Sequence, residues 1–170
     1  AKQGATSFHI SEEHWKNPLL LKPGMTKTEI DKLRIGFDLI IDIDTKFLEY
    51  ARETAILVIE ALKFNDVKNI GLKFSGNNGF HIGIPSQSLP EQVNNIPVVK
   101  LFPEAPRAIA AYLKETIKTR LSEKLLDITK EYTTKLYPVG SVSPLSSQKP
   151  SLKKVETWLK TGQIYGLKFY

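Results

Sequence analysis

Residues 37–44 form a run of β-favouring residues, and a helical pattern follows almost at once at residues 47–62. Apolar residues fill the middle of the run, which predicts a central strand covered on both faces. In the helical pattern, apolar residues recur every three or four positions, which predicts one core-facing stripe. We therefore expect an α+β fold with a mixed or antiparallel sheet and flanking helices.

Other segments complete this expectation. A short helix is expected to begin at Thr26, with Glu29 in a capping box, and to end near residues 35–36. Two strands at 69–74 and 80–84 should form a hairpin, followed by a proline-rich loop at 85–104. A long helix is expected from about Pro106, with an apolar stripe of Ile109, Leu113, Ile117, Leu121, Leu125 and Ile128. We expect one domain over residues 1–170, in which residues 138–151 form a loop or linker and residues 152–170 a short helix and strand.

Composition excludes several classes of protein. A chain of 170 residues suits one core, and its 41% hydrophobic and 25% charged residues are typical of folded domains. Without cysteine it has no disulfide, iron–sulfur cluster, cysteine nucleophile or cysteine-based structural zinc. Its apolar runs are far below the roughly 20 residues that span a bilayer, and no lysine-flanked apolar stretch opens it. We expect a cytoplasmic protein with no membrane partner.

The net charge of +6 is unevenly distributed. Residues 1–104 carry 12 Lys/Arg against 13 Asp/Glu, whereas residues 105–170 carry 12 against 5. A polyanion such as DNA could dock on this last third, and Lys149, Lys153 and Lys154 are the candidate contacts. The alternative is an ordinary lysine-rich surface exposed to solvent.

The predicted central strand ends in two acidic residues. Asp42 and Asp44 are alternate residues, so they project from one face about 7 Å apart. Two carboxylates repel one another unless a cation lies between them, and their hard oxygens suit Mg²⁺ or Mn²⁺ that carries a polyphosphate. In the alternative interpretation, Asp42 only ends the strand and Asp44 caps the following helix.

The predicted hairpin carries the second group of candidate residues. Strand alternation places Lys73 and Ser75 on one side, and His81 returns to the same edge after the turn. Gly76 and Gly79 permit a close approach of the backbone, which a triphosphate would need. A structural turn with a nearby histidine is the alternative.

Taken in order, these two motifs resemble the archaeo-eukaryotic primase superfamily, which includes the catalytic small subunit of DNA primases. Residues 42–44 match its Asp-x-Asp metal motif, and residues 75–81 match its Ser-Gly-x-x-Gly-x-His nucleotide motif. Lys73 matches the Lys-x-Ser-Gly form of the polymerase domain of bacterial end-joining ligases. The resemblance covers about residues 7–125.

The resemblance implies a primase-polymerase catalytic core that performs template-directed nucleotidyl transfer in DNA replication or repair. Asp42 and Asp44 would hold two Mg²⁺ or Mn²⁺ ions and carry the catalysis. Lys73, Ser75, Gly76 and His81 would bind a nucleoside triphosphate. The family has a third acidic ligand with no clear counterpart here, for which Asp127 is a candidate by its order in the chain.

The implied partners are a single-stranded or primed DNA template and a primase large subunit, a helicase or a ligase. Two other functions stay open. One is a catalytically impaired primase-like domain that binds nucleic acid or a partner subunit, which the missing third carboxylate favours. The other is a metal-dependent nuclease or phosphatase with the same aspartate pair, which would need no nucleotide.

Overall fold

The computed structural model describes residue 4 and residues 10–136, with side chains as far as residue 130. In order, the elements are β1 (Glu13–Trp15), the 3-10 turn η1 (Pro18–Leu20), α1 (Lys27–Asp31), β2 (Arg34–Phe37), β3 (Leu39–Asp44), α2 (Leu48–Phe64), β4 (Gly71–Phe74), β5 (Gly79–Ile84), η2 (Ser86–Ser88), β6 (Gln92–Val93), β7 (Ile96–Pro97), η3 (Val98–Leu101) and α3 (Glu104–Leu136). All strand pairings in this part of the chain are antiparallel. The fold is therefore α+β, as expected. The predictions for residues 138–151 and 152–170 concern residues outside the described part of the chain.

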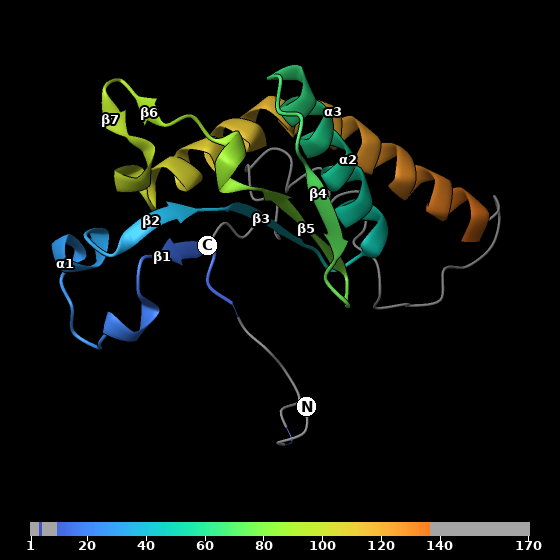
Figure 1. Cartoon of the computed structure of the whole chain (residues 1–170). Helices are drawn as coiled ribbons and strands as arrows, with labels where there is room; N and C mark the ends of the chain where they lie inside the picture. Colours follow the sequence, from blue (N-terminus) through green and yellow to red (C-terminus); the bar gives the residue numbers. More distant parts are fainter. Residues whose placement is uncertain (1–3, 5–9, 137–170) are drawn as a thin grey trace.

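The main sheet has the strand order β3-β5-β4, and two small sheets, β1-β2 and β6-β7, lie beside it (Figure 1). The hairpin predicted from the sequence is present as β4 and β5. Its second strand, β5, occupies the centre of the sheet and pairs with β3 along the whole of residues 39–44. This order places the turn of the hairpin beside the end of β3.

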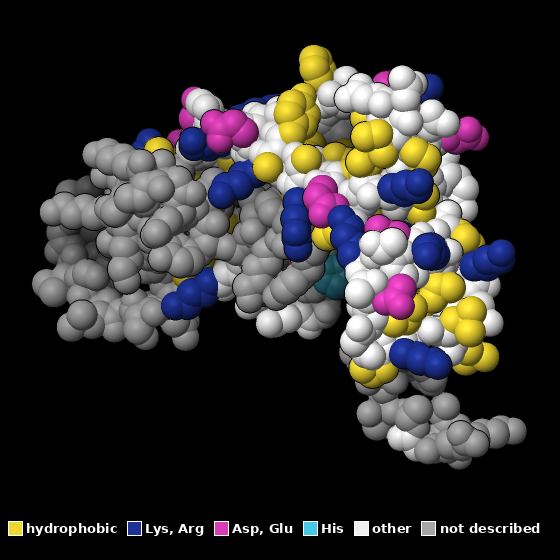
Figure 2. All heavy atoms as spheres, turned by 90° about the vertical axis from the view of Figure 1, so that its left-hand side faces the viewer, with side chains coloured by type: hydrophobic (Ala, Val, Ile, Leu, Met, Phe, Trp, Pro, Cys, Tyr) yellow, Lys and Arg dark blue, Asp and Glu magenta, His cyan; other side chains and the backbone are white. Residues whose placement is uncertain are grey.

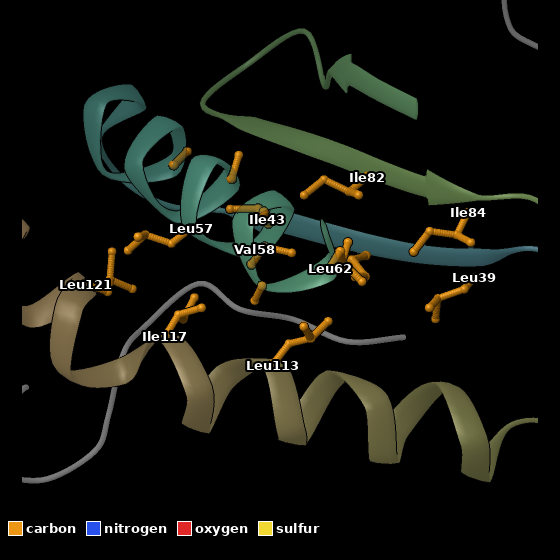
Figure 3. Packing of buried hydrophobic residues seen from close by; sticks show 14 of the residues in the cluster. Leu39, Ile43, Leu57, Val58, Leu62, Ile82, Ile84, Leu113, Ile117 and Leu121 are labelled. Atoms are coloured by element: carbon orange, nitrogen blue, oxygen red, sulfur yellow. The ribbon is translucent and has the colours of Figure 1, made fainter. Parts of the chain in front are cut away.

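Helices α2 and α3 cover one face of the main sheet and enclose the core (Figure 3). Ile41, Ile43 and Ile82 point from the strands into this core, and Leu113 and Leu121 of α3 meet them from the other side. Each such side chain contributes about 1.5–3 kcal/mol when it leaves water. The stripes predicted on the two long helices are thus largely confirmed, although at the end of the part of α3 whose side chains are described, Thr129 is buried and Ile128 is only partly buried.

The opposite face of the main sheet is not covered by any helix of the described residues. Along β3 the residues alternate between buried and exposed, and Ile40 is 37% exposed. The expectation of a strand covered on both faces is therefore wrong. The physical reason is that Asp42 and Asp44 occupy the alternate positions, and burial of their charges would be costly.

The N-terminal part differs from expectation, because it contains the strand pair β1 and β2. The capping box of Thr26 and Glu29 is present, but α1 ends at Asp31 and β2 follows it. Arg34 links β2 to β1, because its buried guanidinium lies 2.7 Å from Glu13 Oε1. Among the residues described, no helix is both long and apolar enough to cross a membrane.

Candidate functional site

Polar side chains line up across the face of the sheet that α2 and α3 leave uncovered. Asp42 on β3 lies opposite His81 on β5, and His81 lies opposite Lys73 on β4. Opposed residues point to the same face of a sheet, so these side chains form one row. His81 Nε2 lies 3.4 Å from Asp42 Oδ1, and both side chains are partly exposed. A carboxylate, an imidazole and an ammonium group thus share one accessible surface.

Asp44 lies on the same face, two residues beyond Asp42, and is exposed. The N-cap of α2 is Phe47, and no side chain caps it. The Thr45 hydroxyl instead donates to the Phe47 carbonyl oxygen at 2.6 Å. The alternative interpretation, in which Asp44 caps this helix, is therefore wrong. Within the described chain no hydrogen bond or ion pair engages the Asp44 carboxylate, so it is available to a ligand.

The turn between β4 and β5 lies at the end of the sheet that carries Asp44. Gly79 is the register partner of Asp44, and the Ser75 amide donates to the Gly79 carbonyl oxygen at 3.0 Å. Gly76 has a φ of 95°, a left-handed conformation that favours glycine. Ser75 and Gly76 are both exposed. The turn thus places its hydroxyl and its backbone close to the aspartates.

At the end of this face that carries the hairpin turn, the carboxylates of Asp42 and Asp44 could bind a cation. Within residues 10–130, no group of three or more His, Cys, Asp or Glu side chains is arranged to hold a metal ion. Mg²⁺ commonly takes one or two protein carboxylates and completes its shell with waters and substrate phosphates. The donor set therefore fits a hard cation that arrives with a polyphosphate.

Other candidate residues are not brought to this face. Asp127 is an exposed residue of α3, on the helical side of the molecule, and lies 3.6 Å from Lys130 Nζ. Lys149, Lys153 and Lys154 lie outside the described residues. On the face shown in Figure 2, Lys and Arg side chains alternate with acidic and apolar ones. No continuous basic patch is visible on the described part of that face.

A cavity of about 820 Å³ opens beside the polar row. Lys73 and His81 line it, whereas Asp42, Asp44 and Ser75 do not belong to its lining. Its other lining residues include Glu12, Gly71 and Gly83, which the sequence motifs do not include. Gly71 and Gly83 lie inside predicted strands, where glycine is unusual, so they could have been recognised from the sequence. No sequence pattern distinguishes Glu12. Burial raises the pKa of the Glu12 carboxyl, and the neighbouring negative charge of Glu13 raises it further.

Comparisons with known proteins give one partial match. Over 60 residues, which are 35% of this chain, the sequence is 43% identical to MJECS07, an uncharacterized protein of Methanocaldococcus jannaschii. The matched segment is 14% of that protein, so most of the relative has no counterpart here. Neither the models of known protein families nor the solved structures give a match.

Proposed function

We propose that this chain is the metal-dependent nucleotidyltransferase core of a DNA primase or polymerase, which initiates or extends strands on a nucleic-acid template. The observation that carries the proposal is the row of Asp42, His81 and Lys73, with Asp44 and Ser75 at its end. The primase resemblance implies the same groups at one site. The Asp44 carboxylate adds support, because it is exposed and no hydrogen bond or ion pair within the described chain engages it.

Each residue has a role in this proposal. Asp42 and Asp44 hold Mg²⁺ or Mn²⁺, which would favour deprotonation of the attacking 3′-hydroxyl and neutralise charge at the phosphorus. His81 and Ser75 donate hydrogen bonds to phosphate oxygens, and Lys73 adds a positive charge next to them. The carboxylate of Asp42, 3.4 Å from His81, orients the imidazole ring.

The proposed substrates are nucleoside triphosphates and a single-stranded or primed DNA template. A primase large subunit, a helicase or a ligase would supply the functions of replication or repair that this domain lacks, in the cytoplasm. Lys149, Lys153 and Lys154 are proposed to contact the template backbone. Binding to single strands should then weaken with salt, with a log–log slope of about −0.7 per phosphate contacted.

A second candidate function is a catalytically impaired primase-like domain that binds nucleic acid or a partner subunit. The observation that favours it is that Asp42 and Asp44 lack a third acidic or histidine ligand among the described residues. This candidate predicts binding of DNA or protein without consumption of nucleotide.

Nucleotide incorporation on a primed DNA template tests the proposal. The full chain is incubated with Mn²⁺ and labelled nucleotides, and Asp42→Asn, Asp44→Asn and His81→Ala are compared with it. Loss of a metal ligand should reduce turnover by more than roughly 10- to 100-fold, which is the usual effect of mutating a residue that hydrogen-bonds to a metal ligand. Asp66→Asn is the matched control, because Asp66 is an exposed residue at φ 61°, which asparagine tolerates.

The outcomes separate the candidate functions. Incorporation that requires Asp42 and Asp44 supports the proposal. DNA binding with no incorporation by the wild-type chain favours the impaired domain. Strand degradation with metal alone, without added nucleotide, identifies a nuclease and refutes the proposal.

A further inference from the structure

Two glycines lie side by side on the uncovered face of the sheet, one step along the strands from the polar row. Gly83 on β5 pairs with Gly71 on β4 and with Ile40 on β3. Neither glycine has a left-handed φ. A Cβ at Gly71 would meet its nearest atom at 3.6 Å, and one at Gly83 would do so at 3.5 Å, which are ordinary contacts. Neither the backbone conformation nor the packing of the described residues requires glycine here.

Glycine inside a strand weakens the strand, because it loses more conformational freedom on folding and adds no packing. Such glycines often mark a site where a ligand approaches the backbone closely. Gly71, Gly83 and Ile40 line the cavity of about 820 Å³. They also line an adjoining hollow of about 490 Å³. The two glycines thus form the floor of a slot, with Ile40 as its apolar side.

The two ends of the slot differ in chemistry. At one end lie Lys73 and His81, the groups assigned to phosphates. Near the other end lie the acidic residues Glu12, Glu13 and Asp38.

Two of these three carboxylates are already engaged. Glu13 pairs with Arg34, and Asp38 lies 3.2 Å from His14 Nε2 while it accepts a hydrogen bond from the Ser86 amide. Glu12 has no side-chain hydrogen bond or ion pair within the described chain. A phosphodiester backbone would be repelled at this end, whereas hydroxyl and amino groups could donate to it.

We propose that this slot binds the nucleoside half of a nucleoside triphosphate, with the base over Gly71 and Gly83 and with Glu12 accepting a hydrogen bond from the sugar or base. The inference rests on the proposed function, since it takes the triphosphate to lie on the Asp42–His81–Lys73 row. The step between the two rows is two residues, about 7 Å, so the phosphates and the nucleoside occupy neighbouring positions on one surface. A flat floor without side chains suits a planar ring.

A comparison of the affinities for two ligands distinguishes the slot from the phosphate site. Calorimetry with Mn²⁺ measures the affinity of the full chain for ATP and for inorganic tripolyphosphate, which lacks a nucleoside. Wild type should bind ATP more tightly than tripolyphosphate. Gly83→Val fills the slot and should weaken ATP binding at least about tenfold, while the affinity for tripolyphosphate stays unchanged. Gln92→Val is the matched control, because it adds a valine to the exposed strand β6, away from the cavity.

Each outcome decides a separate point. If Gly83→Val binds ATP as wild type does, or if wild type binds both ligands equally, the slot is refuted and the proposed function stands. If wild type binds neither ligand, the proposed function fails and the slot with it. If Gly83→Val loses affinity for single-stranded DNA but keeps its affinity for ATP, the slot holds template, which overturns the inference.

A second variant serves if Gly83→Val does not fold. Glu12→Gln keeps the size of the side chain and should lower the affinity for ATP about tenfold, the usual effect of a hydrogen bond to a charged group, with unchanged tripolyphosphate binding. Unchanged affinity for ATP in this variant would refute the role of Glu12.

Discussion

Gly79 allows β5 to approach β3 at the position where the candidate metal ligands lie. It is the register partner of Asp44, and a Cβ built on it would stand 2.2 Å from the Ile43 carbonyl oxygen. Real Cβ atoms are essentially never found closer than 3.0 Å to another heavy atom, and here that atom belongs to the backbone. Gly79→Ala must therefore push the two strands apart between Asp42 and Asp44.

The size of this effect follows from the structure. Overpacking of this kind costs about 1–3 kcal/mol, and a weakened hydrogen bond in the ladder adds about 1 kcal/mol. We expect Gly79→Ala to lower the free energy of unfolding by about 2–4 kcal/mol. Gly83→Ala is the matched control on the same strand, because its Cβ would contact Ile40 Cδ1 at 3.5 Å. It should be neutral or stabilise by up to about 1 kcal/mol.

Urea unfolding followed by circular dichroism measures both variants. With a slope of about 2 kcal/mol per molar urea, the midpoint of Gly79→Ala should fall by about 1–2 M. Mn²⁺ affinity should fall as well, because the separation of the strands displaces Asp44. Equal stability of Gly79→Ala and Gly83→Ala would refute the close approach of the two strands.

Three further predictions concern stability. Leu121→Ala removes a fully buried side chain between α2 and α3 and should lower the free energy of unfolding by about 3 kcal/mol in urea. Arg34→Ala leaves the carboxylate of Glu13 unpaired and removes the buried guanidinium, so thermal unfolding should report a loss of about 3 kcal/mol. The hydrogen bond from Lys124 Nζ at 2.9 Å holds the pKa of the Glu53 carboxyl below its usual value of 4.5. That stabilisation is present above the unfolded-state pKa and lost as the pH falls through the lower folded-state pKa, so the deficit of about 1 kcal/mol in Glu53→Gln at pH 7 should vanish in acid.

Local patterns in the sequence predicted much of the fold. The apolar spacing of α2 and α3, the capping box at Thr26 and the Gly/Asn turn of the hairpin each act within a few residues. The pairing of β1 with β2 was not predicted, because it depends on contacts across the chain. The side chain of Arg34 is buried and pairs with Glu13 between β2 and β1, but from the sequence alone Arg34 would be taken for an exposed surface residue.

For the candidate site, too, local patterns predicted some features and the strand pairing decided the others. Alternation along β3 predicted that Asp42 and Asp44 share one face, and the hairpin motif predicted that Lys73 and His81 share one edge. Only the primase resemblance implied that the two groups form one site. The sequence does not specify which strand of the hairpin pairs with β3, so the direct opposition of Asp42 and His81 required the structure. The row of Gly71 and Gly83 likewise acquires a meaning only once the register is known.

The position of a bound metal ion decides whether Asp42 and Asp44 form a metal site. Crystals of the full chain soaked with Mn²⁺ and a non-hydrolysable nucleoside triphosphate would locate the ion by its anomalous scattering. We expect an ion within about 2.0–2.3 Å of carboxylate oxygens from both Asp42 and Asp44, with triphosphate oxygens within hydrogen-bond reach of His81 and Ser75. An ion bound elsewhere, or a triphosphate that contacts neither the aspartates nor the hairpin, would contradict it.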